Sequence, residues 1–169
     1  MSALTDRIIE QQEARFGAEL GYLRALAASS TAAFAKFGLA GPLLQHRKHL
    51  APGVWHLARL AATRAQDCGT CVQIAVNAAR ADDVPAATLR VALDGDLAAL
   101  APDEATAWRY GEAVATHEGA TEAVAEARRA FGADGLAELA LAVATVQLFP
   151  ILKRGLGQDV ACRLVHVEV

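Results

Sequence analysis

Two cysteines, Cys68 and Cys71, stand three residues apart in the stretch DCGTCVQIAVNAARADD, at the expected start of a helix. At 100° per residue they lie about 60° apart around that helix, on its apolar, alanine-rich side. Unpaired amides and the helix dipole at such an N-terminus favour a thiolate. A thiolate attacks an electrophile such as a peroxide oxygen, and the second thiol resolves the intermediate as a disulfide. The spacing therefore predicts a redox dithiol.

Two other interpretations of this pair stay open. Cys68 and Cys71 could be small hydrophobic residues packed in a core. They could also be half of a zinc site, because Cys162 and His166 in CRLVH have the spacing that completes a set of four ligands. Asp67, in position to cap the helix, favours a helix start and hence the redox pair. The long separation of the two halves disfavours zinc, and we expect no metal.

A redox dithiol also needs a proton acceptor, and His56 is the best candidate in the sequence. It opens the predicted helix immediately before the cysteine helix, so antiparallel packing of the two helices is expected to bring it close to the thiols. The alternative is a histidine at the surface or hydrogen-bonded in the core. Glu112 is a weaker candidate base on a later helix. His46 and His49, in QHRKH, are expected in a solvated loop.

The composition indicates the scaffold that must position these residues. Apolar residues make up 54% of the 169 residues and aromatic residues only 5%, and runs of alanine and leucine replace the alternation typical of strands. We therefore predict an all-α fold, a single-domain helical bundle spanning residues 1–169. The net charge of −3 comes with scattered basic residues, so neither nucleic acid nor a membrane surface is an expected partner.

The polar and apolar pattern predicts about seven helices. We expect them at 4–15, within 16–38 where glycines break the helical region, at 54–65 and 68–81, and after Pro85. The later ones are expected to open with the PDEA motif, to end at Gly132, and to run from 136 towards Pro150, where KRGLG ends the last helix. Residues 39–53 are expected to be rich in loop because they contain glycines and two prolines. The apolar stretch 135–152 is interrupted by Glu138, Gln147 and Pro150 and is expected to be buried between subunits.

The cysteine content and the N-terminus together predict the cellular compartment. The N-terminal residues MSALTDRIIEQQEARF carry charges every few positions and show no export signal. Three cysteines in such a chain are typical of a reducing compartment. We therefore expect a cytoplasmic protein.

The stretch VWHLARLAATRAQDCGTCVQIAVNAARADDVP resembles the core motif of the carboxymuconolactone decarboxylase and alkylhydroperoxidase D-like (AhpD-like) superfamily. The segment ARRAFGADGLAELALAVATVQLFPILKRGLG is similar to its last helical hairpin, so the resemblance spans 54–157. It implies an all-helical subunit that assembles into trimers or hexamers and reduces hydroperoxides. It also implies that Cys71 is the peroxidatic thiol and Cys68 the resolving one. The helix dipole alone favours Cys68 as the thiol of lower pKa, so this assignment stays open.

The chain departs from the proton relay that the resemblance implies. Superfamily peroxidases have a glutamate twelve residues before the first cysteine and a histidine four residues after the second. This chain has His56 and Ala75 at those two positions. Either His56 has taken over as the base, or the dithiol is slow with peroxide and serves disulfide exchange or redox sensing.

These observations predict a thiol-dependent peroxidase or disulfide oxidoreductase with Cys68, Cys71 and His56 as catalytic residues and no organic cofactor. Its expected partners are an organic hydroperoxide or another small electrophile, an external lipoyl or thioredoxin-like dithiol reductant, and further copies of the chain. One alternative is a non-catalytic, redox-responsive oligomeric protein. Another is a decarboxylase-like lyase that uses His56, although the decarboxylases of the superfamily lack the cysteine pair.

Overall fold

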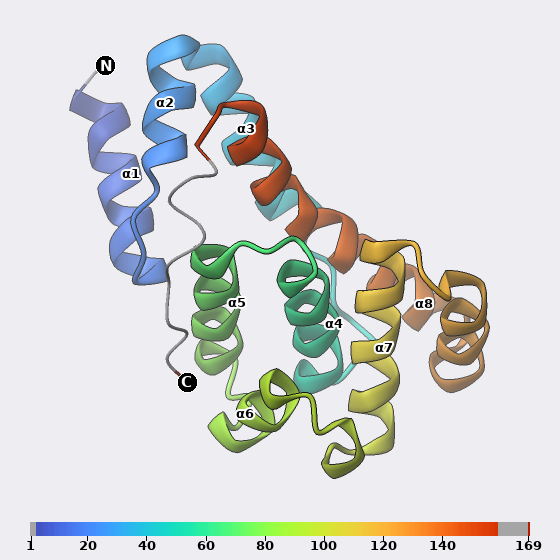
Figure 1. Cartoon of the computed structure of the whole chain (residues 1–169). Coiled ribbons are helices and arrows are strands. Elements are labelled where there is room, and N and C mark those ends of the chain that lie inside the picture. The colour runs from blue at the N-terminus through green and yellow to red at the C-terminus, as the bar shows by residue number, and fades with distance from the viewer. Residues whose placement is uncertain (1–2, 159–168) are drawn as a thin grey trace.

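The computed structural model describes residues 3–158 and residue 169. In this part of the chain every regular element is helical, which confirms the all-α prediction (Figure 1). The elements are α1 (Ala3–Phe16), α2 (Gly21–Ser29), α3 (Thr31–Leu44), α4 (Pro52–Arg64), α5 (Gly69–Ala81), α6 (Ala86–Asp94), the short 3₁₀ helix η1 (Leu97–Ala99), α7 (Pro102–Thr116) and α8 (Ala120–Gly155).

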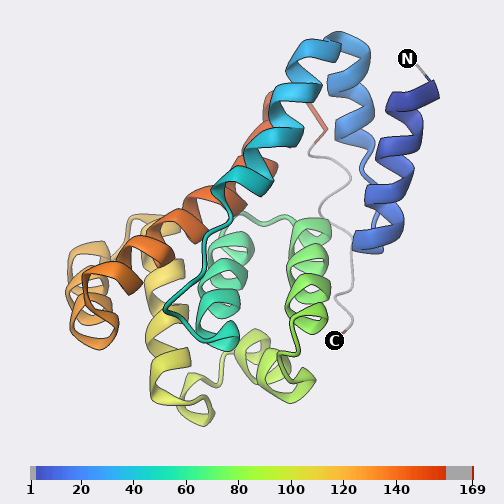
Figure 2. The same ribbon diagram turned by 180° about the vertical axis from the view of Figure 1, so that it is seen from behind.

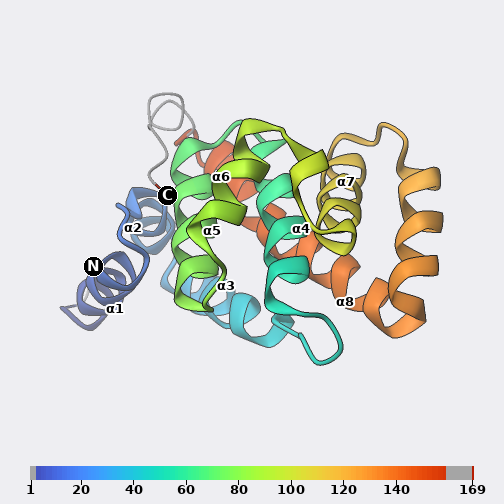
Figure 3. The same cartoon turned by 90° about the horizontal axis from the view of Figure 1, so that it is seen from below.

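Helix α4 lies at the centre of the arrangement. It stands between α5 and α7 in a row of three helices (Figures 1 and 3), and α8 crosses both α4 and α7. The C-terminal half of α8 runs beside α3, as the view from behind shows (Figure 2). Because α4 is covered on several sides, most of its residues are buried. The cysteine helix α5 is therefore positioned mainly through its packing on α4.

The sequence of α4 provides two apolar faces at helical spacing. Trp55, Ala58 and Ala62 face a cluster shared with α7 and α8. Leu57 and Leu60 face a second cluster shared with α5, α6 and α7. Positions three or four apart fall on one side of a helix, so the two sets point in different directions. The apolar periodicity of this segment thus explains its central place.

Small residues bring α4 and α7 into close contact. A β-carbon added to Gly111 of α7 would lie 2.1 Å from the carbonyl oxygen of Ala58 and 2.8 Å from its carbonyl carbon. No side chain fits at that distance, since non-bonded carbon atoms pack at about 3.5–4.0 Å. Glycine at position 111 is therefore a condition of the α4–α7 packing.

A buried carboxylate ties α8 to the loop before α4. Glu138 is 1% exposed and accepts hydrogen bonds from the backbone amides of Lys48 (2.9 Å), His49 (2.9 Å) and Leu50 (3.2 Å). The His49 ring also contacts it through Nδ1 at 2.8 Å. Burial raises the pKa of Glu138, but these hydrogen bonds outweigh burial and hold the pKa below its ordinary value. His49 lies in an exposed loop, as expected, and its backbone amide and ring Nδ1 anchor that loop on Glu138.

The N-terminal third differs from the predicted pattern at two points. Ser30, and not a glycine, separates α2 from α3, and its hydroxyl caps α3 by accepting from the amide of Ala33 at 3.2 Å. Helix α3 then continues through Pro42 to Leu44, where a loop was expected. Proline removes one backbone donor near the end of the helix, and α3 packs there against α8, where the rings of Phe37 and Phe149 meet edge to face.

Helix α8 combines the last two predicted helices. They meet at Gly132, whose φ of 71° and ψ of −171° interrupt the helical backbone at the predicted boundary. In the described residues α8 is the helix that is long and apolar enough to cross a membrane, judged by length and composition. Its buried residues, which include Leu139, Val143 and Val146, pack with α4 and α7 in a core cluster.

We expect Gly111→Ala to lower the free energy of unfolding by about 3 kcal/mol, because the added methyl group forces α4 and α7 apart. Gly38→Ala is the matched control. Gly38 lies in α3 with no heavy atom within 4 Å of an added β-carbon, so that change should be neutral or stabilise by up to about 1 kcal/mol. Urea unfolding followed by circular dichroism measures both variants. Equal stability of the two variants contradicts the close packing.

Candidate functional site

The two cysteines meet at the first turn of α5. Cys68 is the N-cap residue, with φ of −120° and ψ of 89°, and Cys71 lies within the first turn. Their Cα atoms are 5.2 Å apart and their sulfur atoms lie at disulfide distance. The predicted capping by Asp67 is wrong, because Asp67 takes a left-handed conformation (φ 51°) in the turn before the helix. This sharp turn brings Cys68 to the helix end.

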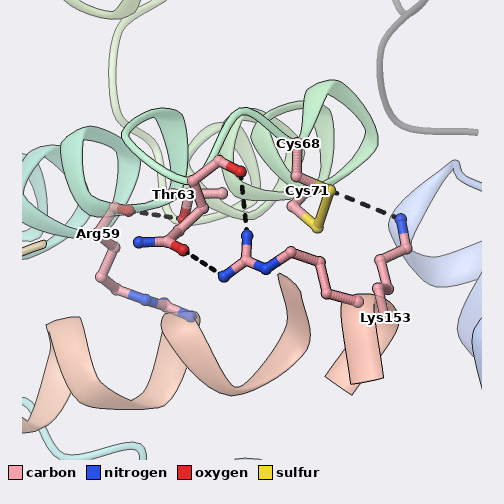
Figure 4. The surroundings of a disulfide bond; sticks show 7 residues. Arg59, Thr63, Cys68, Cys71 and Lys153 are labelled. Carbon is pink, nitrogen blue, oxygen red and sulfur yellow. Dashed lines mark hydrogen bonds between the residues drawn. A yellow bond between two sulfur atoms is a disulfide. The ribbon is translucent and has the colours of Figure 1, made fainter. Parts of the chain in front are cut away.

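The last turn of α8 holds the turn between α4 and α5 in place (Figure 4). Arg154 donates to the side-chain oxygen of Gln66 at 2.7 Å and to its carbonyl oxygen at 3.4 Å. Within the turn, the amide of Asp67 donates to the carbonyl of Arg64 at 3.0 Å. The backbone just before Cys68 is thus fixed by a residue that lies far away in the sequence.

Lys153, also from the last turn of α8, contacts the first cysteine. Its Nζ donates to Sγ of Cys68 at 3.6 Å, and Figure 4 shows this ammonium directed at the sulfur pair. Lys153 is only 5% exposed, and its Nζ also lies 5.4 Å from the ring centre of Tyr22 in α2. Cys68 and Cys71 are 3% and 7% exposed. A buried positive charge therefore faces a buried sulfur.

Sequence reasoning identified the cysteines and missed Lys153. The motif KRGLG predicts only the end of a helix. One signal was present, since two basic residues follow a long apolar helix and basic residues favour the helix C-terminus. Nothing local connects them to cysteines 85 residues earlier.

The structure does not bring His56 to the cysteines. Helices α4 and α5 are antiparallel and joined by a short turn, so a residue near the start of α4 lies opposite the end of α5. His56 accordingly contacts Asp82, the C-cap residue of α5, with 3.1 Å between Nε2 and Oδ2. Helix α5 has 13 residues, so about 20 Å separate its two ends. The expected proximity fails for this geometric reason.

His56 is a buried, neutral histidine. It is 5% exposed. Burial lowers its pKa to about 4, and the positive charge of Arg59 adds to this effect. The hydrogen bond and charge of Asp82 offset part of it by favouring the imidazolium.

The remaining candidates from the sequence lie elsewhere. Glu112 is exposed on α7, which stands on the other side of α4 from α5 (Figure 1). Ala75 is partly buried and packs against the cluster between α4 and α5. Cys162 and His166, proposed as alternative zinc ligands, lie outside the described residues. Within residues 3–158 and 169, no group of three or more His, Cys, Asp or Glu side chains has the arrangement of a metal site.

Comparison of the chain with protein-family models, with curated proteins and with solved structures finds no match. Arguments about function therefore depend on the geometry of the site.

The low pKa of His56 predicts a specific loss of stability in acid. The ordinary pKa of histidine is 6.5, and the pKa of His56 in the folded chain is about 4. Between these two pH values the unfolded chain binds a proton on this ring that the folded chain does not. The stability conferred by the neutral ring is complete above this window and falls by about 3 kcal/mol as the pH drops through it.

Urea unfolding at several pH values, for the wild type and for His56→Gln, measures this effect. The variant lacks the titrating ring, so its stability should vary less between pH 6.5 and 4. Parallel pH profiles for the two proteins contradict the assignment of a neutral, buried His56.

Proposed function

We propose that the chain is a thiol-dependent oxidoreductase that reduces an organic hydroperoxide, or a similar small electrophile, with the Cys68–Cys71 pair. The observation that supports this most is the ammonium of Lys153 against the sulfur of Cys68, at the N-terminal end of α5. A cation and a helix N-terminus both lower the pKa of a thiol and favour the reactive thiolate. A cysteine with a purely packing role needs neither.

The same contact favours Cys68 as the nucleophile. Its thiolate attacks the outer oxygen of the hydroperoxide, the O–O bond breaks, and the alkoxide takes up a proton and leaves as an alcohol. The thiol of Cys71 then attacks the sulfenic acid of Cys68. The S–S bond forms as water leaves, made from the hydroxyl group and the thiol proton. This order reverses the roles that the superfamily resemblance implies.

An external dithiol, lipoyl or thioredoxin-like, then reduces the disulfide and is itself oxidised. The resemblance of residues 54–157 to the AhpD-like superfamily supports the same chemistry and suggests a trimer or hexamer, while the cysteine content and the N-terminal residues favour the cytoplasm. Exposed apolar side chains, Leu39 and Leu43 on α3 and Ile151 on α8, are consistent with assembly of copies of the chain. The chemistry uses only the chain's own sulfur atoms and the two substrates.

The burial of both sulfurs favours one rival function. A pair that is 3% and 7% exposed could act as a non-catalytic redox sensor, whose oxidation state changes the packing of α2 and α8 around Lys153. A sensor consumes one equivalent of peroxide as its disulfide forms, whereas an enzyme supplied with a reductant consumes peroxide repeatedly. Steady-state kinetics therefore distinguish the two functions.

We expect the wild type to consume cumene hydroperoxide continuously when dihydrolipoamide is supplied in excess. Cys68→Ser should lose this turnover, since the alcohol that replaces the thiol does not ionise near neutral pH. Cys71→Ser should accumulate a sulfenic acid on Cys68, which mass spectrometry after trapping detects. A single round of disulfide formation without turnover indicates the sensor and contradicts the enzyme.

Replacing Lys153 tests its role beside the nucleophile. Lys153→Met keeps the length of the side chain and removes its charge, so the pKa of the Cys68 thiol in the reduced protein should rise. We expect disulfide formation with peroxide at pH 7 to slow by about tenfold, the effect of one pKa unit. Lys153→Arg should restore much of the rate. The thiolate absorbance at 240 nm, followed against pH, measures the pKa directly.

Lys36→Met is the matched control, because Lys36 is an exposed lysine on α3. It should leave the thiol pKa and the rate unchanged. If Lys153→Met and the wild type have the same pKa and the same rate, Lys153 does not activate Cys68.

A further inference from the structure

Apart from Lys153 beside the cysteines, two arginines place positive charge around Trp55 in α4. The guanidinium of Arg59 stacks on the Trp55 ring, with 4.0 Å between Cζ and the ring centre. Figure 4 shows the Arg59 side chain extending from α4 towards α8. Arg47, from the loop before α4, lies 6.0 Å from the same ring centre. Two arginines thus approach one buried indole.

Two buried donors in this cluster have no hydrogen-bond partner in the described part of the chain. They are Nε of Arg59 and Nε1 of Trp55. Leaving a buried N–H unpaired destabilises the folded protein, and the cost is larger for a charged group. Native proteins pair most buried donors, so two unpaired donors in one cluster indicate a place where a hydrogen-bond acceptor binds.

The charges around Trp55 do not balance. Asp82 is the carboxylate whose charge acts on Arg59, and it also accepts from Arg47 at 2.7 Å and contacts His56 at 3.1 Å. Burial lowers the pKa of Arg59 to about 10, an effect that Asp82 only partly offsets, and the guanidinium remains charged at neutral pH. With His56 neutral, two positive charges face one negative charge.

We propose that the Arg59–Trp55 cluster binds the carboxylate of a small organic acid. A monoanion neutralises the single excess positive charge, whereas a phosphate dianion would leave a buried negative charge. The planar guanidinium binds a carboxylate through two parallel N–H donors. Leu50 and Val54 share a core cluster with Trp55, so the surroundings of the indole are apolar and strengthen the attraction between the guanidinium and a carboxylate. The side chains of Arg47 and Asp82, 28% and 42% exposed, mark the side open to solvent.

Binding of benzoate tests this proposal, which is independent of the redox chemistry. We expect benzoate to raise the melting temperature of the wild type and to change its tryptophan fluorescence, with inorganic phosphate and chloride at the same ionic strength having much less effect. Arg59→Met should weaken benzoate binding at least tenfold, as measured by calorimetry. Trp55→Phe, which keeps an aromatic ring but loses the N–H donor, should weaken it less.

Arg128→Met is the matched control, because Arg128 is an exposed arginine on α8 and should not affect binding. If Arg59→Met fails to fold, Arg59→Lys and Trp55→Phe provide the comparison. The proposal is overturned if benzoate has no effect on the wild type at concentrations on the order of 10 mM. It is also overturned if phosphate binds equally well, or if the folded Arg59 variant binds benzoate as tightly as the wild type.

Discussion

The buried carboxylate of Glu138 is the contact on which the position of α4 depends. Three successive backbone amides, those of residues 48–50, and the His49 ring converge on it. Helix α4 begins two residues after this loop, at Pro52. Fifteen residues further along α8, Lys153 contacts the sulfur of Cys68, which follows the turn at the other end of α4. One helix therefore holds both the entry to α4 and the turn that leaves it.

Local features of this chain could be predicted from sequence, because they depend on residues close together along the chain. Helical spacing of apolar residues placed α4, α5 and the kink at Gly132. The disulfide pair was predictable for the same reason, since Cys68 and Cys71 are separated by one helical turn. Helix α3 shows the limit of this reasoning. The helix continues through Pro42 against the local preference of proline for a helix end, and it packs on α8, a contact that no local pattern predicts.

The environment of the cysteines could not be predicted, because tertiary packing creates it. The contact between Lys153 and Cys68 joins residues that are 85 positions apart in the chain, and no periodic pattern in the sequence predicts such a contact. The prediction that His56 lies near the cysteines failed for a different reason, because the geometry of two antiparallel helices already argues against it. In two antiparallel helices joined by a short turn, residues equally far from the turn lie opposite each other. His56 lies near the start of α4, so its neighbour belongs at the end of α5.

The buried ammonium of Lys153 has a consequence for the redox poise of the cysteine pair. It attracts a thiolate on Cys68, whereas the disulfide offers it no negative charge. The reduced form gains this attraction and the oxidised form does not, so the reduction potential of the pair rises. Thermodynamic linkage then requires the reduced chain to gain folding stability from the same attraction. The cation that we propose as the activator of Cys68 thereby also makes the disulfide a stronger oxidant, which an external dithiol reduces more easily.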